Sequence, residues 1–289
     1  MPNDFILRYV GFDDAGQPFL ECQAANTAQR INILGRELSL AVDMSTRFCT
    51  GWLDIINKSS HACPDAATVD TKYDSCIACR NRTGFNPAFY NTTDVSEQQQ
   101  HINQQPHFVY IAYFAPGAIK VGISQAARGI RRLLEQGARA AMQLETFPTA
   151  LIARHYEAKI AQLPGIAEHL PQHKKTTLLA QPFDASLAAA ELQECAITIG
   201  QQLGVQFPQA THIDTESHFY QQPIDLTVAV HIKQPPAVVG RAVAMIGPLL
   251  ISEWQGNLVS YDMKKLLGYR MASSADAAIT LPESQLTLF

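Results

Sequence analysis

The stretch Phe108–Ser124, FVYIAYFAPGAIKVGIS, consists of two short apolar runs on either side of a Pro-Gly turn. Apolar runs of this length that are bounded by turn residues are typical of β-strands, so the stretch predicts a hairpin. Polar side chains interrupt both runs, with Tyr110 in the first and Lys120 in the second. The question is whether these polar groups make the hairpin a functional element.

The segments that follow the hairpin have the spacing of helices. Apolar residues at Ile130, Leu133 and Leu134 recur with a helical period, and the same segment carries Arg128 and Arg132. Further helices are predicted over 149–163, which contains a glutamate and ends before a Pro-Gly pair, and over 185–204.

The hairpin and the first two helices resemble the GIY-YIG nuclease fold. In that family two strands carry the signature tripeptides, and here Val109-Tyr110-Ile111 and Lys120-Val121-Gly122 stand in their place. The family's next helix supplies an arginine, and a later helix supplies a glutamate that binds a divalent metal. The resemblance therefore implies a catalytic site of Tyr110, Lys120, Arg132 or Arg128, and Glu157, gathered on one concave face. Two departures are visible, because Lys120 replaces the second tyrosine and Gln136 stands where some members have a histidine.

The chemistry implied by this resemblance is hydrolysis of a phosphodiester. Tyr110 would take a proton from water as a phenolate, and the Lys120 ammonium would lower the pKa of that phenol. Arg132 would neutralise charge on the phosphoryl group, and Glu157 would hold Mg²⁺ or Mn²⁺. Each residue also has an ordinary structural interpretation. Tyr110 can be a core tyrosine, the arginines can form a solvated helix face, and Glu157 can pair with a neighbouring basic residue.

Four cysteines are concentrated in the segment 49–79. Cys49, Cys63, Cys76 and Cys79 have the spacing C-x13-C-x12-C-x2-C, and a C-x2-C pair on a turn chelates zinc readily. Four protein ligands leave no position open for water, so the predicted zinc site is structural. His61 is an alternative ligand to Cys63, because neutral imidazole also suits zinc. A redox role for Cys76 and Cys79 is the other alternative.

Over a wider span the chain is similar to an uncharacterised bacterial family, domain of unknown function 2797. The similarity rests on RFCTGW, CP, SCIAC, the hairpin itself and RLLEQGA, which together extend from Arg47 to Ala138. The family label implies no activity.

Composition and patterning predict an α+β protein made of several units. Short apolar runs broken by glycine precede the hairpin and recur after residue 225, where they suggest a small, partly closed β-barrel. The predicted units are a β-rich N-terminal domain over 1–105 with the zinc-binding insert at 49–79, a GIY-YIG-like α/β domain over 106–180, a helical connector over 181–224, a small β domain over 225–270 and a flexible tail over 271–289.

The charge balance limits the class of partner. The chain has 22 lysines and arginines against 26 aspartates and glutamates, a formal net charge of -4. A general basic coat is therefore excluded, and a nucleic-acid partner must meet positive charge that is concentrated locally. Neither a transmembrane run nor a basic signal region is present, so we expect a cytoplasmic location and no membrane partner.

The last five residues, QLTLF, resemble the bacterial sliding-clamp-binding motif, whose preferred form is Gln-Leu-(Ser/Asp)-Leu-Phe. The resemblance implies that Gln285, Leu286, Leu288 and Phe289 bind the clamp, a ring on duplex DNA. The alternative is a short edge strand folded back on the C-terminal domain. Taken together, the sequence predicts a zinc-containing, DNA-associated protein, with a metal-dependent endonuclease in DNA repair or replication as the leading hypothesis. A non-catalytic nucleic-acid-binding module or adaptor that keeps the fold is the alternative.

Overall fold

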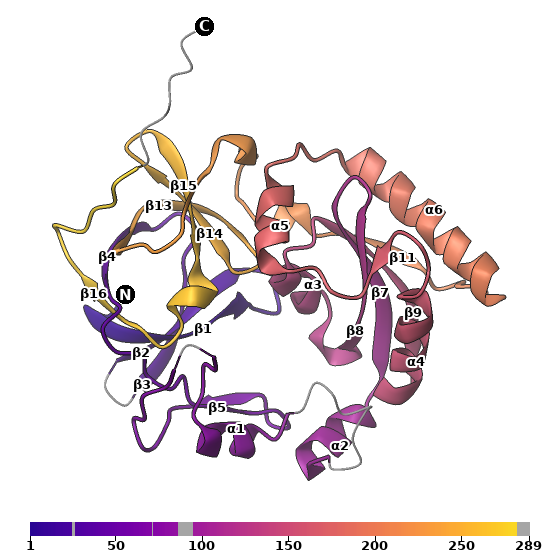
Figure 1. Ribbon diagram of the computed structural model, residues 1–289, viewed down its shortest axis with the longest axis horizontal. Coiled ribbons are helices and arrows are strands. Elements are labelled where there is room, and N and C mark those ends of the chain that lie inside the picture. The colour runs from indigo at the N-terminus through magenta and orange to yellow at the C-terminus, as the bar shows by residue number, and fades with distance from the viewer. Residues whose placement is uncertain (25–26, 71, 86–94, 282–289) are drawn as a thin grey trace, which may run out of the picture.

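The structure is a computed structural model that describes residues 1–24, 27–70, 72–85 and 95–281. Within these residues the chain forms mixed α and β structure around two sheets (Figure 1). The large sheet has nine strands in the order β12 (Val230–Ile232), β15 (Asn257–Asp262), β14 (Leu249–Trp254), β13 (Ala237–Ile246), β4 (Glu37–Asp43), β16 (Arg270–Ser273), β1 (Asp4–Phe12), β2 (Pro18–Ala24) and β3 (Thr27–Asn32). The small sheet has five, in the order β10 (Ile166–Ala167), β8 (Ala118–Gln125), β7 (His107–Ala115), β9 (Ala140–Phe147) and β11 (Thr211–Asp214).

The helices and a short third sheet complete the description. The helices are α1 (Ile77–Thr83), α2 (Glu97–Asn103), α3 (Arg131–Gln136), α4 (Ala150–Ile160), α5 (Gln172–Leu179) and α6 (Ala185–Leu203), and a 3-10 turn, η5, covers Met263–Leu266. Strands β5 (Trp52–Asp54) and β6 (Ser59–His61) pair with one another beside α1. No helix within the described residues is both long enough and apolar enough to cross a membrane.

The large sheet joins the two ends of the chain. Strand β4 pairs on one side with β13 and on the other with β16, both antiparallel. Side chains from both ends pack into one core, including Leu7 and Leu20 with Val238, Leu250 and Tyr261. The N-terminal segment and the segment after residue 225, predicted as separate domains, therefore share one sheet and one core. The predicted barrel is also corrected, because β12 and β3 remain edges and the sheet does not close within the described residues.

The predicted tail and the predicted connector are partly built into the sheets. Strand β16 begins at Arg270, and Ala277 is buried farther along, so the first part of the segment 271–289 packs against the large sheet. The clamp-like residues Gln285, Leu286, Leu288 and Phe289 lie outside the described residues. In the predicted connector 181–224, α6 packs on β9 and β7, and β11 pairs with β9 as an edge strand of the small sheet.

Strand β7 is the centre of the small sheet, and all nine of its residues are buried. Because side chains alternate along a strand, β7 serves two cores. Val109 and Ile111 face the core that contains α4 and α6. Phe108 and Tyr110 belong to the other core, which contains Leu133 of α3. The predicted hairpin is present as β7 and β8, and Tyr110 lies on the face of the sheet towards α3.

Helix α3 connects the cores of the two sheets. Its residue Leu133 is buried with the small sheet, and the next residue, Leu134, is buried with the large sheet. Nearby, the buried side chains of Arg139 and Glu216 form two hydrogen bonds of 2.9 and 2.6 Å. Figure 1 shows α3 and α5 between the two sheets, with α4 and α6 on the far side of the small sheet. The backbone that carries Arg132 is therefore fixed from both sides.

Candidate functional site

The four predicted zinc ligands lie together beside α1. The Sγ atoms of Cys49, Cys63, Cys76 and Cys79 are all within 4.8 Å of one another, and those of Cys63 and Cys76 are 4.0 Å apart. Tetrahedral Zn–S bonds of about 2.3 Å place sulfur atoms about 3.8 Å apart. The four thiols can therefore hold a metal ion such as zinc. We call residues 49–79 the knuckle.

Local backbone geometry supports thiolates at this position. The backbone N–H groups of Gly51 and Cys76 donate hydrogen bonds to Cys49 Sγ, at 3.3 and 3.2 Å. Such donors stabilise the negative charge of a ligating sulfur and orient it. Gly51 has a φ of 87°, and a Cβ added there would lie 2.0 Å from the carbonyl oxygen of His61. Position 51 therefore requires a glycine, because a side chain there would collide with the backbone of His61 at the end of β6.

His61 is not part of the thiol group. Its ring stacks on Trp52 with centroids 4.2 Å apart, and its Nε2 is hydrogen-bonded to Ser59 Oγ at 2.9 Å. Cys63 completes the group of four instead. Of the two alternatives for this ligand, the structure favours the cysteine.

Arg8, on β1, attaches the knuckle to the large sheet. Its guanidinium donates to the carbonyl oxygen of Thr50 at 2.8 Å, to Ser60 Oγ at 3.0 Å and to the carbonyl oxygen of His61. The residue is only 4% exposed, and Glu21 lies 3.8 Å from its Nη1. No sequence motif predicted this role for Arg8. The available signal was a lone arginine inside the apolar run FILRYV.

Tyr110 is fully buried on β7, opposite Gly122 of β8. A Cβ on Gly122 would lie 2.5 Å from the Tyr110 hydroxyl, so the glycine of the second tripeptide makes room for the phenol. That hydroxyl has no hydrogen-bond partner among the described residues. Burial raises the pKa of Tyr110, and the nearby Arg132 guanidinium opposes this shift.

Lys120 lies on β8, opposite Ala112, and is 9% exposed. Its Nζ donates to the carbonyl oxygen of Val121 at 2.8 Å. Burial lowers the pKa of Lys120 to about 8, with Glu157 opposing the shift and Arg132 adding to it. The expectation that Lys120 would lower the pKa of Tyr110 is corrected, because burial outweighs the neighbouring charges and the phenol titrates above its usual range.

Glu157 is buried on α4, where its charge acts on both Lys120 and Tyr110. Its carboxylate forms an ion pair with Arg154, which also contacts Glu168 at 2.5 Å. Burial raises the pKa of Glu157, and the hydrogen bond from Arg154 opposes the rise. Within the described residues, only the four cysteines form a group of three or more metal-ligating side chains. A single carboxylate already paired with an arginine does not fit a preformed Mg²⁺ or Mn²⁺ site.

The arginines near α3 have different partners. Arg128 is ion-paired with Glu135, and Arg131 lies 3.2 Å from Asp14. Arg132 has no carboxylate partner among the described residues, and its charge acts on the Tyr110 hydroxyl. Of the two alternatives for the site arginine, Arg132 is therefore the one available to a ligand.

Lys175, on α5, is a further cation of this site, and the sequence marked it only as one residue of the charged run HKKTT. It is 8% exposed, and its Nζ donates to the backbone carbonyl and the side-chain oxygen of Gln136 at 2.8 and 3.1 Å. Burial lowers the pKa of Lys175 to about 7, and the charges of Lys120, Arg132 and Lys264 lower it further. Within the described residues no carboxylate pairs with it.

We call Tyr110, Lys120, Arg132, Glu157 and Lys175 the polar cluster. They come from β7, β8, α3, α4 and α5. The charges of Arg132 and Glu157 act on Tyr110 and Lys120, and the charges of Lys120 and Arg132 act on Lys175. Three of the five are cations, and the one carboxylate is paired with a fourth cation. The cluster therefore has an excess of positive charge, with Lys120 and Lys175 buried and Arg132 half-buried, and an anion stabilises such an arrangement.

A protein-family model matches the chain over residues 35–271 and is described as a protein of unknown function, DUF2797. The match covers well over half of the chain. The chain belongs to the DUF2797 family. No curated protein and no solved structure shows a significant match. The region shared with the DUF2797 family includes both the knuckle and the polar cluster.

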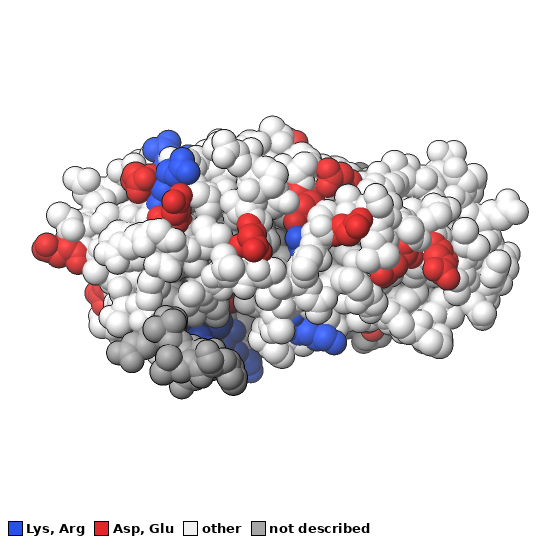
Figure 2. Space-filling view, turned by 90° about the horizontal axis from the view of Figure 1, so that it is seen from above, with Lys and Arg blue, Asp and Glu red and all other residues white. Residues whose placement is uncertain are grey.

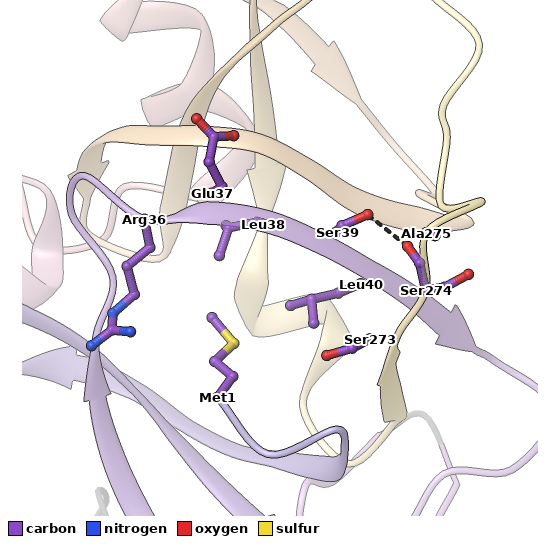
Figure 3. Close-up of a pocket in the computed structure, with 9 residues that line it drawn as sticks. All are labelled: Met1, Arg36, Glu37, Leu38, Ser39, Leu40, Ser273, Ser274 and Ala275. Carbon is purple, nitrogen blue, oxygen red and sulfur yellow. Dashed lines mark hydrogen bonds between the residues drawn. The ribbon is translucent and has the colours of Figure 1, made fainter.

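A separate hollow of about 510 Å³ lies at the start of β4, where Ser39 Oγ donates to the carbonyl oxygen of Ser274 at 2.6 Å. Figure 3 shows this hydrogen bond and the residues around the hollow. It is lined by Met1, Arg36, Glu37, Leu38, Ser39, Leu40, Ser273, Ser274 and Ala275. One arginine and one glutamate are its only charged side chains, so it shows no comparable excess of charge.

Proposed function

We propose that this DUF2797 protein binds DNA, with the polar cluster as the site for a phosphodiester and the knuckle as the site of a structural zinc ion. The observation that carries the proposal is the group of three cations, the buried Lys120 and Lys175 and the half-buried Arg132, without a free carboxylate to balance them. A phosphate would relieve the repulsion among these cations and accept charge-assisted hydrogen bonds from them.

Each group of the cluster has a role that suits a phosphate. The planar guanidinium of Arg132 can donate two parallel hydrogen bonds to phosphate oxygens, and the lysines can act as compact charges. The Tyr110 phenol stays protonated because its pKa is raised, so its hydroxyl, which lies beside the Arg132 guanidinium, can donate to a third oxygen. Figure 2 shows lysine and arginine only in small groups on the face that it draws, which fits binding at a local site.

Hydrolysis of the bound phosphodiester is the second candidate function. The chain order of β7, β8, α3 and α4 is the order of strand, strand, helix and helix that the GIY-YIG resemblance implies. The observation in its favour is that the pKa of Lys175 is about 7 and that of Lys120 about 8, values suited to giving a proton to a leaving oxygen. The raised pKa of Tyr110 and the pairing of Glu157 with Arg154 weigh against it.

Binding is tested by fluorescence anisotropy with labelled DNA at several salt concentrations. We expect Arg132→Ala to weaken binding about tenfold and to reduce the salt slope by about 1, because one phosphate contact is lost. Arg131→Ala is the matched control on the same helix, since that arginine is paired with Asp14. Equal loss in both variants, or no loss in either, would contradict a specific site.

Cleavage is tested with branched, nicked and single-stranded DNA, with Mg²⁺, Mn²⁺ or chelator. Cleavage by the wild type that is lost in Glu157→Gln would establish the nuclease hypothesis over simple binding. Binding without any cleavage would support the non-catalytic module.

We also propose recruitment by the bacterial sliding clamp through Gln285, Leu286, Leu288 and Phe289. The support is the resemblance of QLTLF to the clamp-binding motif, and a DNA partner agrees with the expected cytoplasmic location. A chain lacking the last two residues should lose binding to purified clamp. Retained binding would refute this part of the proposal.

A further inference from the structure

A cleft of about 1140 Å³ lies between α5 and the large sheet. One wall is formed by α5, including His173 and Thr177, and the other by residues of β12, β15 and η5. Sites for small molecules usually have volumes of about 300–1,000 Å³. The cleft is slightly larger than this range, so it has room for a segment of a chain molecule as well as for a small ligand.

The charged side chains of the cleft favour an anion. Lys233 and Lys265 line it and are exposed, whereas Asp262 is its only acidic side chain. Asp262 accepts a hydrogen bond from the backbone of Lys264 at 3.2 Å and lies 3.9 Å from Lys265 Nζ. Lys233 has no ion pair among the described residues. The cleft thus offers two cations that the protein itself compensates only weakly.

The floor of the cleft is apolar and carries an aromatic ring. Leu226, Leu249, Ile251, Leu266 and Tyr269 line it. At its edge, His231 Nδ1 is hydrogen-bonded to Ser260 Oγ at 3.1 Å. Cations beside an apolar floor with a few polar groups match the nucleotide unit, which combines a phosphate with a flat base. The Tyr269 ring is only 9% exposed and has the Arg47 guanidinium 5.9 Å from its centroid, so it adds little to this floor.

The cleft and the polar cluster share two elements. Helix α5 presents Thr176 to the cleft, and the adjacent residue Lys175 belongs to the polar cluster. In η5, Lys265 lines the cleft, while the charge of the neighbouring Lys264 acts on Lys175. Figure 1 shows α5 between the two sheets. A strand held in the cleft is therefore brought next to the phosphate site.

We propose that this cleft binds a single-stranded segment of nucleic acid, with phosphates at Lys233 and Lys265 and bases against the apolar floor. The inference extends the proposed function and rests on it, because the strand leads to the phosphodiester in the polar cluster. The apolar floor favours a single strand over a duplex. In a duplex the bases are stacked and paired, so their faces are not available to the floor.

The test uses the full chain and three labelled or competing ligands: a ten-residue oligothymidylate, a hairpin duplex of equal length, and thymidine monophosphate. The cleft variant is the double substitution Lys233→Glu and Lys265→Glu. Its control is Arg36→Glu with Lys159→Glu, which reverses two exposed charges outside both the cleft and the knuckle. Thermal unfolding of each variant checks that it is folded.

We expect the wild type to prefer the single strand, and the cleft variant to bind it at least tenfold more weakly while the control is unchanged. If the monophosphate and the oligonucleotide bind equally tightly, the cleft is a site for a free nucleotide, and the proposal of a bound strand is overturned. Unchanged binding in the cleft variant, with loss in Arg132→Ala, would overturn the cleft and leave the phosphate site standing. No binding of any ligand by the wild type would overturn both.

Discussion

The knuckle gathers its four thiols from one stretch, 49–79, whereas the polar cluster draws on five elements between Tyr110 and Lys175. The two sites also differ in what surrounds them. Apart from Trp52, the side chains packed around the thiols are small. Tyr110 and Arg132 of the polar cluster lie near α3, where the cores of both sheets meet, while Glu157 comes from α4, which packs on the other face of the small sheet. A site in a core-poor segment depends on its ligand for folding, while a site inside a core can stay folded at a cost in stability.

This comparison predicts that loss of the metal site has the largest effect on the fold. Structural zinc in small motifs contributes about 10–16 kcal/mol of apparent binding energy, so Cys76→Ser should unfold the knuckle. We expect zinc content near one per chain in the wild type and near zero in the variant, with thermal unfolding shifted down by several degrees. Elemental analysis and calorimetry measure both, and strong chelator should reproduce the variant.

The control is Cys195→Ser, which removes a half-buried thiol on α6 outside the group of four. The prediction is contradicted if the wild type contains no metal and the four thiols of the knuckle are all titratable, while Cys76→Ser is as stable as the wild type. The two sites would then not differ in their dependence on a ligand.

A smaller effect is expected where the knuckle meets the large sheet. Arg8→Gln removes hydrogen bonds to Thr50, Ser60 and His61 and leaves Glu21 with Arg30 as its remaining ion-pair partner. Hydrogen bonds from charged groups contribute about 1.5–3 kcal/mol each, so the loss of three should cost at least about 4 kcal/mol. Urea unfolding measures it.

Arg8→Gln also tests whether attachment of the knuckle to the large sheet is independent of metal binding by the four thiols. Zinc content should stay at the wild-type level in Arg8→Gln, because the four thiols remain. Arg30→Gln, on the exposed end of the same network, should cost less than about 1 kcal/mol. If Arg8→Gln and Arg30→Gln cost the same, Arg8 does not attach the knuckle to the sheet.

The same contrast explains how much could be predicted from the sequence. Local signals worked: the thiol spacing marked the group of four, the Pro-Gly turn marked the β7–β8 hairpin, and the helical period marked α4 and α6. Long-range pairing did not, because nothing in β4 indicates that its neighbours are β13 and β16. For the same reason Arg8 and Lys175 were not predicted, since the role of each depends on partners far away in the sequence.

Lys175 gives the smallest and most discriminating test, because substitution there should stabilise the protein. The pKa of Lys175 in the folded chain is about 7, below the value of about 10.4 for an unfolded lysine. Between these values the unfolded state binds the extra proton, so the free energy of unfolding rises with pH. Below about pH 7 both states are protonated, and the cost of burying the charge beside Lys120, Arg132 and Lys264 is fully present.

Lys175→Met keeps the aliphatic stem and removes the charge, at the cost of two hydrogen bonds to Gln136. We expect the variant to exceed the wild type by about 1–3 kcal/mol in unfolding free energy at pH 6, and the gain to shrink towards pH 9. It should also bind DNA more weakly, and phosphate should raise the melting temperature of the wild type more than that of the variant. Lys174→Met, at the exposed neighbouring position, is the control and should change neither property. A variant that is less stable than the wild type at pH 6 would show that the fold itself already satisfies the lysine, and the case for a missing anion would fail.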